Sequence, residues 1–139
     1  IDGSQIHIEI TESTLLNSNS TMLDNLDRFT RDGIALWLDD FGTGYSGLRH
    51  LRELPVAGLK IDKSFVDRLE SDLDDFRIVS AITAMACSLG LKIVAEGVET
   101  EAQMQMLSQL GCTTLQGYLI GRPAPLDSLQ QTWASRPIN

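Results

Sequence analysis

The chain has 139 residues, of which 42% are hydrophobic and 22% are charged, and its formal net charge is −8. This composition is typical of a soluble globular domain with a core of its own, and it argues against disorder. The negative charge argues against a broad binding surface for nucleic acid polymers or anionic membranes. A phosphate ligand would therefore need metal ions to offset the acidic groups.

The sequence contains no recognisable targeting or membrane-spanning segment. No apolar run approaches the roughly 20 residues that a membrane span needs, and no signal peptide is visible. The chain starts without Met, at IDGSQ, so we interpret it as an excised piece of a longer protein. Cys87 and Cys112 lie in apolar, patterned surroundings, which predicts buried thiols in a reducing cytosol and hence a cytoplasmic location.

Strand and helix patterns alternate along the chain. Apolar residues at every second position predict strands, and apolar stripes at spacings of three and four predict helices. The predicted strands cover residues 5–12, 34–39, 59–62, 91–96 and 113–119. The predicted helices cover about 20–31, 48–54, 76–89, 102–110 and 126–133. Four glycines each end a predicted helix and precede a strand: Gly33, Gly58, Gly90 and Gly111.

Three local patterns add detail to this assignment. Thr100 and Gln103 form a Thr-x-x-Gln capping box at the start of a predicted helix. In the first strand, Ile6 belongs to the apolar face, together with every second residue that follows it. His7, on the polar face, is interpreted as a packed or hydrogen-bonded histidine rather than a metal ligand.

Alternating strands and helices predict a parallel sheet with right-handed crossovers. An open doubly wound sheet and part of a (β/α)8 barrel both fit this pattern. Polar residues at the C-terminal ends of five strands favour the barrel, because barrel active sites are built at that end. A complete barrel takes roughly 250 residues. The predicted fold class is therefore α/β, a partial (β/α)8 TIM-like barrel with about five βα units, and residues 1–139 are about half, the C-terminal part, of one such domain.

The candidate site is centred on Asp39 and Asp40, at the end of an apolar strand and before a glycine-rich loop. Two adjacent carboxylates repel each other, so a divalent cation between them would stabilise the pair. A solvated strand end is the alternative interpretation. With Glu9 and Glu96 they offer oxygen ligands that suit Mg²⁺ or Mn²⁺, and a pair of such ions would activate a water and hold a phosphoryl oxygen.

Other residues near this site have two possible interpretations each. Lys60 could neutralise developing charge or position a water, or it could form a structural salt bridge with Asp62 or Glu96. The glycine-rich segment 42–44 lacks the spacing of a phosphate loop, so we interpret it as a mobile lid. Glu12 follows Glu9 by three residues, and Glu99 follows Glu96 by three residues; Glu9 and Glu96 are the acids predicted to point into the site. Either could hold the loop by accepting backbone N–H bonds, or could be a surface carboxylate.

Five segments of the chain read EITES, LDDFGTGYSGL, LPVAGLKIDKSFV, SLGLKIVAEGVET and QGYLIGRP. They resemble the C-terminal part of bacterial EAL domains, and the resemblance covers almost the whole chain. It implies a modified (β/α)8 barrel that hydrolyses cyclic di-GMP to linear pGpG with two Mg²⁺ or Mn²⁺ ions. The Glu-Ala-Leu motif and an Asn ligand belong to the N-terminal half of that domain, which would be a partner of this chain.

The resemblance also implies a role for individual residues. The metal ligands would be the five carboxylates Glu9, Asp39, Asp40, Asp62 and Glu96. Lys60 and Glu96 would act around the attacking water as catalytic residues. Glu12 and Glu99 would stabilise the DFGTGYSG loop, which in the family couples the active site to dimerisation, and Glu99 would complete the site wall together with Gln116. The substrate would be bound by Gln116, Gly117 and Tyr118.

The predicted function is metal-dependent hydrolysis of cyclic di-GMP by the intact domain, which would form a homo-oligomer, most simply a dimer. The 139-residue chain by itself is predicted to be inactive. A non-catalytic cyclic di-GMP receptor or interaction module is the alternative. No partner that is a nucleic acid polymer and no membrane contact is expected from this segment.

Overall fold

The computed structural model describes residues 2–44, 51 and 54–134, apart from the side chains of Leu16 and of residues 131–134. Five parallel strands form one sheet in the order β1-β2-β3-β4-β5. The strands are β1 (His7–Thr11), β2 (Ala35–Phe41), β3 (Gly58–Ile61), β4 (Lys92–Ala95) and β5 (Thr114–Leu115). This sequential order is that of a segment of a (β/α)8 barrel, whereas a doubly wound sheet reverses its strand order. The predicted fold class is therefore confirmed.

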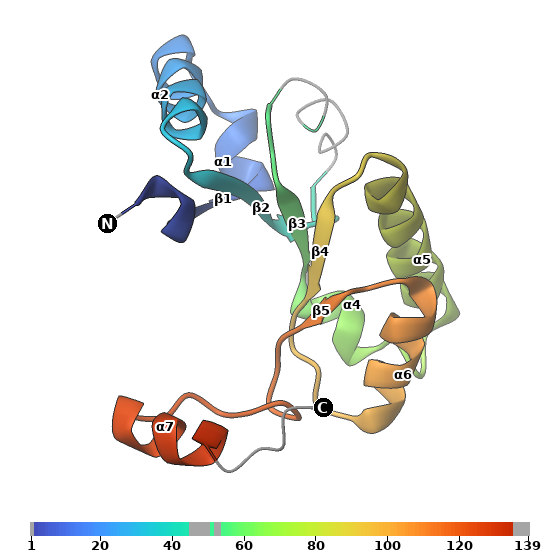
Figure 1. The fold of residues 1–139 in the computed structure, drawn as a ribbon. Helices are drawn as coiled ribbons and strands as arrows, with labels where there is room; N and C mark the ends of the chain where they lie inside the picture. The colour runs from blue at the N-terminus through green and yellow to red at the C-terminus, as the bar shows by residue number, and fades with distance from the viewer. Residues whose placement is uncertain (1, 45–50, 52–53, 135–139) are drawn as a thin grey trace.

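Most of the described helices connect successive strands and cover one face of the sheet. They are η1 (Gly3–Gln5), α1 (Glu12–Leu16), α2 (Ser20–Arg31), α4 (Lys63–Asp67), α5 (Leu73–Ser88), α6 (Glu101–Leu110) and α7 (Leu126–Ala134). In Figure 1, α5 and α6 lie together beside the sheet, and α7 lies away from them at the end of an extended connection. The predicted helix over 48–54 falls mostly outside the described residues. Within the described part, no helix is long and apolar enough to cross a membrane.

The predicted signals for helix α6 are confirmed at both ends. Thr100 Oγ1 accepts a hydrogen bond from Gln103 N at 3.0 Å, and Gln103 Oε1 accepts one from Thr100 N at 3.0 Å, which completes the capping box. Gly111 ends the helix with φ 97°. This left-handed conformation is favoured by glycine, because other residues carry a Cβ that clashes there.

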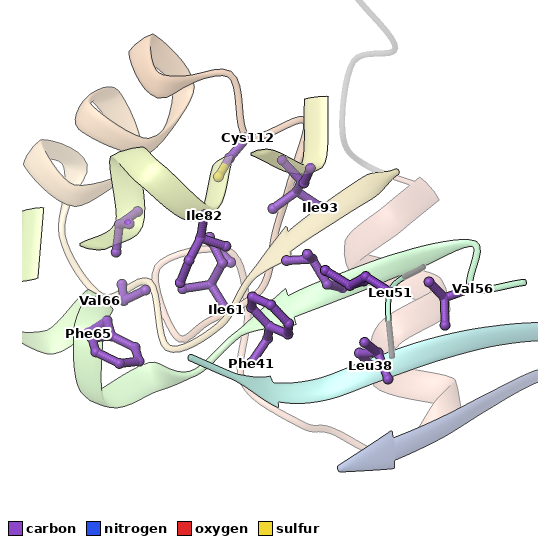
Figure 2. Packing of buried hydrophobic residues seen from close by; sticks show 14 of the residues in the cluster. Leu38, Phe41, Leu51, Val56, Ile61, Phe65, Val66, Ile82, Ile93 and Cys112 are labelled. Carbon is purple, nitrogen blue, oxygen red and sulfur yellow. The ribbon is translucent and has the colours of Figure 1, made fainter. Parts of the chain in front are cut away.

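The hydrophobic core lies between the sheet and the helices. The parallel register places Ile10 beside Leu38, and Leu38 beside Leu59, so the apolar residues of neighbouring strands share a face. All three are buried. Figure 2 shows this core, which α4, α5 and the segment after α6 complete with Phe65, Val66, Ile82 and Cys112. The opposite face of the sheet carries Glu9 and Lys60, together with Trp37, which is paired with Glu9 in the register of β1 and β2.

Two sequence predictions about these elements were wrong. The strand predicted at 113–119 is limited to β5, because the chain turns immediately afterwards and Ile120 N donates to Gly117 O at 3.0 Å. Cys87 is exposed, whereas Cys112 is buried as predicted. Cys87 follows the buried Ala86 by one position, which turns it about 100° away from the buried stripe of the helix.

At the start of the chain, Ile6 is 38% exposed because it precedes the paired residues of β1. His7 is exposed but stacks on Trp37, with the ring centroids 5.8 Å apart. This aromatic contact agrees with the interpretation of a packed histidine.

Candidate functional site

A bulge in β2 allows the side chains of Asp39 and Asp40, which are neighbours in the chain, to approach the same site. The register with β3 shifts between Leu38 and Phe41, so β2 contains one extra residue there. In a regular strand, adjacent side chains point to opposite faces, and the extra residue relieves this constraint. Asp40 has φ 54°, a left-handed conformation that non-glycine residues adopt at a cost and that often marks a functional site.

Lys60 lies among three carboxylates from different strand ends. Its Nζ is 2.8 Å from Glu9 Oε2, 3.2 Å from Asp39 Oδ1 and 2.6 Å from Glu96 Oε1. The Lys60 side chain is 10% exposed. The structure thus brings together residues from β1, β2 and β3 with the residue that follows β4.

The neighbours of these groups change their pKa values. Burial of Lys60 disfavours the ammonium form, but hydrogen bonds with the three carboxylates outweigh this effect and raise the pKa of Lys60. It is therefore protonated at neutral pH and acts as a cation rather than a base. Burial raises the pKa of Asp40, and the negative charges of Asp39, Asp62 and Glu96 raise it further.

We refer to Glu9, Asp39, Asp40, Asp62 and Glu96 as the carboxylate cluster. The single positive charge of Lys60 does not balance these acids. Asp39 Oδ1 is buried and, apart from its ion pair with Lys60, accepts no hydrogen bond from the described residues. Hard oxygen donors with incomplete charge compensation are the chemistry of a divalent cation site.

The carboxylate cluster by itself does not provide all the ligands of a divalent cation site. Among the described residues, no three His, Cys, Asp or Glu side chains are placed to hold one ion together. The ammonium of Lys60 lies between three of the carboxylates instead. The donor set therefore fits a divalent cation, while a complete coordination shell requires further ligands.

Asp62 connects the cluster to α4. It follows β3 directly, and its Oδ1 accepts a hydrogen bond from Ser64 N at 2.9 Å, which makes it the N-cap of the helix. It is also close enough to Asp40 to raise the pKa of that carboxyl group. Asp62 is therefore held in place by the helix while it faces the other acids.

Glu12 contacts the glycine-rich segment that follows β2. Its side chain is 2% exposed, and its Oε2 accepts a hydrogen bond from Gly44 N at 3.2 Å. A Cβ at position 44 would lie 2.7 Å from Glu12 Cδ, so a larger residue there would displace the Glu12 carboxyl group. The predicted mobile lid continues into residues 45–47, which lie outside the described residues.

A pocket of about 230 Å³ opens beside the cluster. We call it the Tyr118 pocket, and it is lined by Lys63, Glu96, Gly97, Glu99, Gln116, Gly117 and Tyr118. The three residues predicted to bind substrate all lie in its wall. Glu96 belongs to both the pocket and the carboxylate cluster, so the two are contiguous.

Close backbone contact fixes one wall of this pocket. Val98 N donates to Gln116 O at 3.0 Å, and Leu119 N donates to Val98 O at 3.0 Å. A Cβ at Gly117 would lie 2.1 Å from Val98 O, which no side chain could tolerate without displacement. The turn that carries Tyr118 is therefore packed directly on the loop that follows β4.

Glu99 lies in the wall of the Tyr118 pocket, and its predicted contact with the loop stays a prediction, because residues 45–47 of that loop lie outside the described residues. In the described part of the chain it makes no contact with residues 41–44, and its Oε1 accepts a hydrogen bond from Lys63 Nζ at 2.9 Å. This hydrogen bond lowers the pKa of Glu99. Sequence reasoning missed Lys63 because its partner is 36 residues away along the chain, and no local pattern indicates such a pair.

Sequence reasoning also missed Arg122. Its guanidinium carbon lies 4.2 Å from the centroid of the Tyr118 ring, in a cation–π contact. Lys63 Nζ lies 6.0 Å from the same centroid. Two cations therefore lie near the ring of the half-exposed Tyr118.

Comparison with known proteins identifies similar sequences. The profile of the EAL domain family matches residues 1–123. The chain is 49% identical over 129 residues to the bifunctional diguanylate cyclase/cyclic di-GMP phosphodiesterase MucR of Pseudomonas aeruginosa. That alignment covers 93% of this chain and 19% of MucR, so the chain spans less than a fifth of that relative.

Solved structures show the same similarity in three dimensions. The PaMucR phosphodiesterase in complex with cyclic di-GMP superposes with a TM-score of 0.87 and 49% identity, over 93% of this chain and 52% of that one. Klebsiella pneumoniae BlrP1, in a complex with manganese and cyclic di-GMP, superposes with a TM-score of 0.83 and 31% identity. The match covers 89% of this chain and 32% of the BlrP1 chain.

Proposed function

Because the chain belongs to the EAL domain family, we propose that it is the C-terminal part of a domain that hydrolyses cyclic di-GMP to linear pGpG. The observation that carries this proposal is the carboxylate cluster around Lys60, which lies beside a pocket that could hold part of the substrate. MucR is described as a cyclic di-GMP phosphodiesterase, and the PaMucR phosphodiesterase structure contains cyclic di-GMP, which supports the same substrate. Cyclic di-GMP is a messenger inside bacterial cells, so we place this segment in the cytoplasm.

We propose that the carboxylate cluster binds two divalent ions, Mg²⁺ or Mn²⁺. The ligands would be all five carboxylates of the cluster, Glu96 included, and the complete domain would supply the others. When bound, such ions activate a water and neutralise charge on the phosphodiester. The incompletely compensated oxygens of the cluster and the manganese in the BlrP1 complex support this assignment.

Lys60 and Glu96 would act on the attacking water and the phosphoryl group. Lys60 is held as a cation, so it can stabilise the negative charge that develops on a phosphoryl oxygen. Glu96 Oε1 lies 2.6 Å from Lys60 Nζ, where its carboxylate can take the proton of the water. Attack of that water on phosphorus would break one ester P–O bond, and the leaving oxygen would be protonated from solvent.

Two further groups would support the reaction. Glu12 would hold the glycine-rich loop through Gly44 N. Gln116, Gly117 and Tyr118 would bind the substrate in the Tyr118 pocket. Glu99 lines this pocket and does not contact the described part of the loop. We therefore propose that it contributes to substrate binding.

The decisive experiment is hydrolysis of cyclic di-GMP by the full-length protein with Mg²⁺, comparing wild type with Asp39→Asn. This change keeps the side-chain shape and removes a ligand charge, so we expect the rate to fall by at least about 100-fold while the melting temperature changes little. Asp24→Asn, on the exposed surface of α2, is the matched control and should retain activity. Turnover by Asp39→Asn at the wild-type rate would refute the metal assignment.

A further inference from the structure

Gln103 is a buried polar side chain that has no role in the proposed function. It is 5% exposed and occupies the third position of α6, where it completes the capping box with Thr100. Its Oε1 accepts hydrogen bonds from Glu99 N at 2.8 Å and from Thr100 N at 3.0 Å. Its Nε2 donates a hydrogen bond to Val66 O at 3.1 Å. A capping box needs only the acceptor, so capping does not account for the bond to Val66.

This bond joins two segments that leave the sheet at the carboxylate cluster. At the end of the pairing between β3 and β4, Glu96 N donates a hydrogen bond to Ile61 O at 3.2 Å. Beyond this point one segment continues into α4, and the other continues into the loop before α6. Gln103 connects the two again, because its carbonyl oxygen holds the loop while its amino group holds Val66 of α4.

Each of the two segments carries a carboxylate of the cluster. Asp62 Oδ1 accepts a hydrogen bond from Ser64 N at 2.9 Å, so the orientation of Asp62 follows that of α4. Glu96 lies three residues before Glu99, whose backbone N–H group is held by Gln103. A movement of α4 relative to the loop would therefore change the separation between the carboxylates of Asp62 and Glu96.

Two other contacts connect the same segments, but both lie at the surface. Lys63 Nζ is 2.9 Å from Glu99 Oε1, with 49% and 45% of the side chains exposed. Thr100 Oγ1 donates a hydrogen bond to Glu70 Oε1, which is likewise exposed. Exposed ion pairs contribute little, because water screens them. A buried group that loses its partner is more costly, so the amide of Gln103 is the stronger connection.

Resting on the proposed function, we propose that Gln103 is a positioning residue that fixes the separation between Asp62 and Glu96. It acts through the backbone of two segments, and it contacts neither carboxylate directly. Misplacement of reacting groups by about 1 Å can lower a rate by about 100-fold. The rate of hydrolysis should therefore depend on the amino group of this buried side chain.

Gln103→Glu separates positioning from helix capping. The glutamate carboxylate can accept the bonds from Glu99 N and Thr100 N, and it suits the N-terminal end of a helix. These bonds favour its ionised form, which cannot donate to Val66 O. In the full-length protein with Mg²⁺, kcat for cyclic di-GMP should fall by at least about tenfold. KM should change by less than about threefold, because Glu99 stays anchored in the wall of the pocket.

Three further variants accompany this measurement. Gln105→Glu makes the same change at an exposed position of the same helix and should keep the wild-type kcat. Asn19→Ala removes the N-cap of α2, so it should lower the melting temperature without lowering kcat. Gln103→Met removes all three hydrogen bonds without adding a charge, and it should lower kcat at least as much as Gln103→Glu. Should Gln103→Glu fail to fold, Gln103→Met replaces it in both measurements.

Hydrogen exchange of the Ser64 amide gives a second readout that needs no turnover, because this amide donates to Asp62 Oδ1. Mass spectrometry with peptide fragmentation resolves it in the same proteins. Exchange should accelerate by at least about fivefold in Gln103→Glu, and it should stay at the wild-type rate in Gln105→Glu.

The two readouts separate this proposal from the proposed function. In an active protein, the proposal requires both the lower kcat and the faster exchange, and it is overturned if either is missing. It is overturned as well if Asn19→Ala lowers kcat as much as Gln103→Glu, since general instability would then explain the loss. If wild type does not hydrolyse cyclic di-GMP, the phosphodiesterase proposal fails, and the exchange of Ser64 alone decides whether Gln103 positions Asp62.

Discussion

Lys60 sets the charge balance of the carboxylate cluster. Its ammonium contacts three carboxylates at 2.6 to 3.2 Å, and these contacts raise its pKa although burial opposes the charged form. Because the pKa is raised in the folded state, the stabilising contribution is complete at neutral pH and is lost only as the pH rises through the raised value. Removal of this ammonium would leave the carboxylates facing one another.

We therefore expect Lys60→Met to lower the free energy of unfolding by about 1–3 kcal/mol near neutral pH. The deficit comes from repulsion between negative charges, so it should shrink towards about pH 4, the range in which carboxyl groups ordinarily become protonated. Added Mn²⁺ should restore part of the stability, because an ion bound to the folded state replaces the missing charge. Urea denaturation at both pH values, with and without Mn²⁺, measures these effects.

Lys92→Met is the control for this experiment, because Lys92 is exposed at the start of β4 and no ion pair is recorded for it in the described part of the chain. Its unfolding free energy should stay within about 0.5 kcal/mol of wild type. A deficit for Lys60→Met that is independent of pH would show that the methionine disturbs packing rather than charge.

At the scale of elements, the sequence patterns predict the order of strands and helices but not their local irregularities. The alternation of apolar residues and the capping box at Thr100 depend on neighbours in the chain, and the structure confirms both. The bulge in β2 depends on its pairing with β3, which no local pattern reveals. The early end of β5 likewise depends on the packing of Gly117 against Val98, a contact between separate segments.

The residues of the candidate site likewise fall into two groups, those that the sequence predicts and those that only the three-dimensional structure reveals. The positions of Asp39 and Lys60 at strand ends predict that both belong to the site, because the strand ends of a parallel barrel sheet converge. The pair formed by Lys63 and Glu99 joins α4 to the loop before α6, so it appears only in three dimensions. Two short helices, α1 and α4, were missed because five residues are too few to show a helical stripe.

The contact between Glu12 and Gly44 couples α1 to the segment after β2. We expect Glu12→Ala to accelerate hydrogen exchange of the Gly44 amide by at least about fivefold, because the N–H group loses its buried acceptor. Glu12→Gln keeps an amide oxygen in place and should retain most of the protection. Exchange measured by NMR resolves this single amide. Wild-type protection of Gly44 in the alanine variant would contradict the proposed role of Glu12 in holding the loop.

At the scale of the whole molecule, the sheet of the described residues is open. The strand order β1-β2-β3-β4-β5 leaves β1 and β5 each with a single neighbour, and in Figure 1 the strands curve without closing. Closure into a barrel of this class takes eight strands. An open parallel edge carries unpaired N–H and C=O groups, which are a site of association with another chain.

We accordingly expect the purified 139-residue chain to self-associate. The five residues of β1 give the longer edge, and a two-fold dimer would cover the same edge of both copies with one symmetric interface. Sedimentation velocity across micromolar concentrations should show a species near twice the mass of one chain.

Replacement of the exposed Ile6 by Lys should weaken this association, because a charged side chain next to an edge strand disfavours pairing. Leu89→Lys, on an exposed position after α5, is the control and should leave the association unchanged. A monomer that persists over this concentration range and unfolds cooperatively would show that the chain protects the edge of β1 without a second copy.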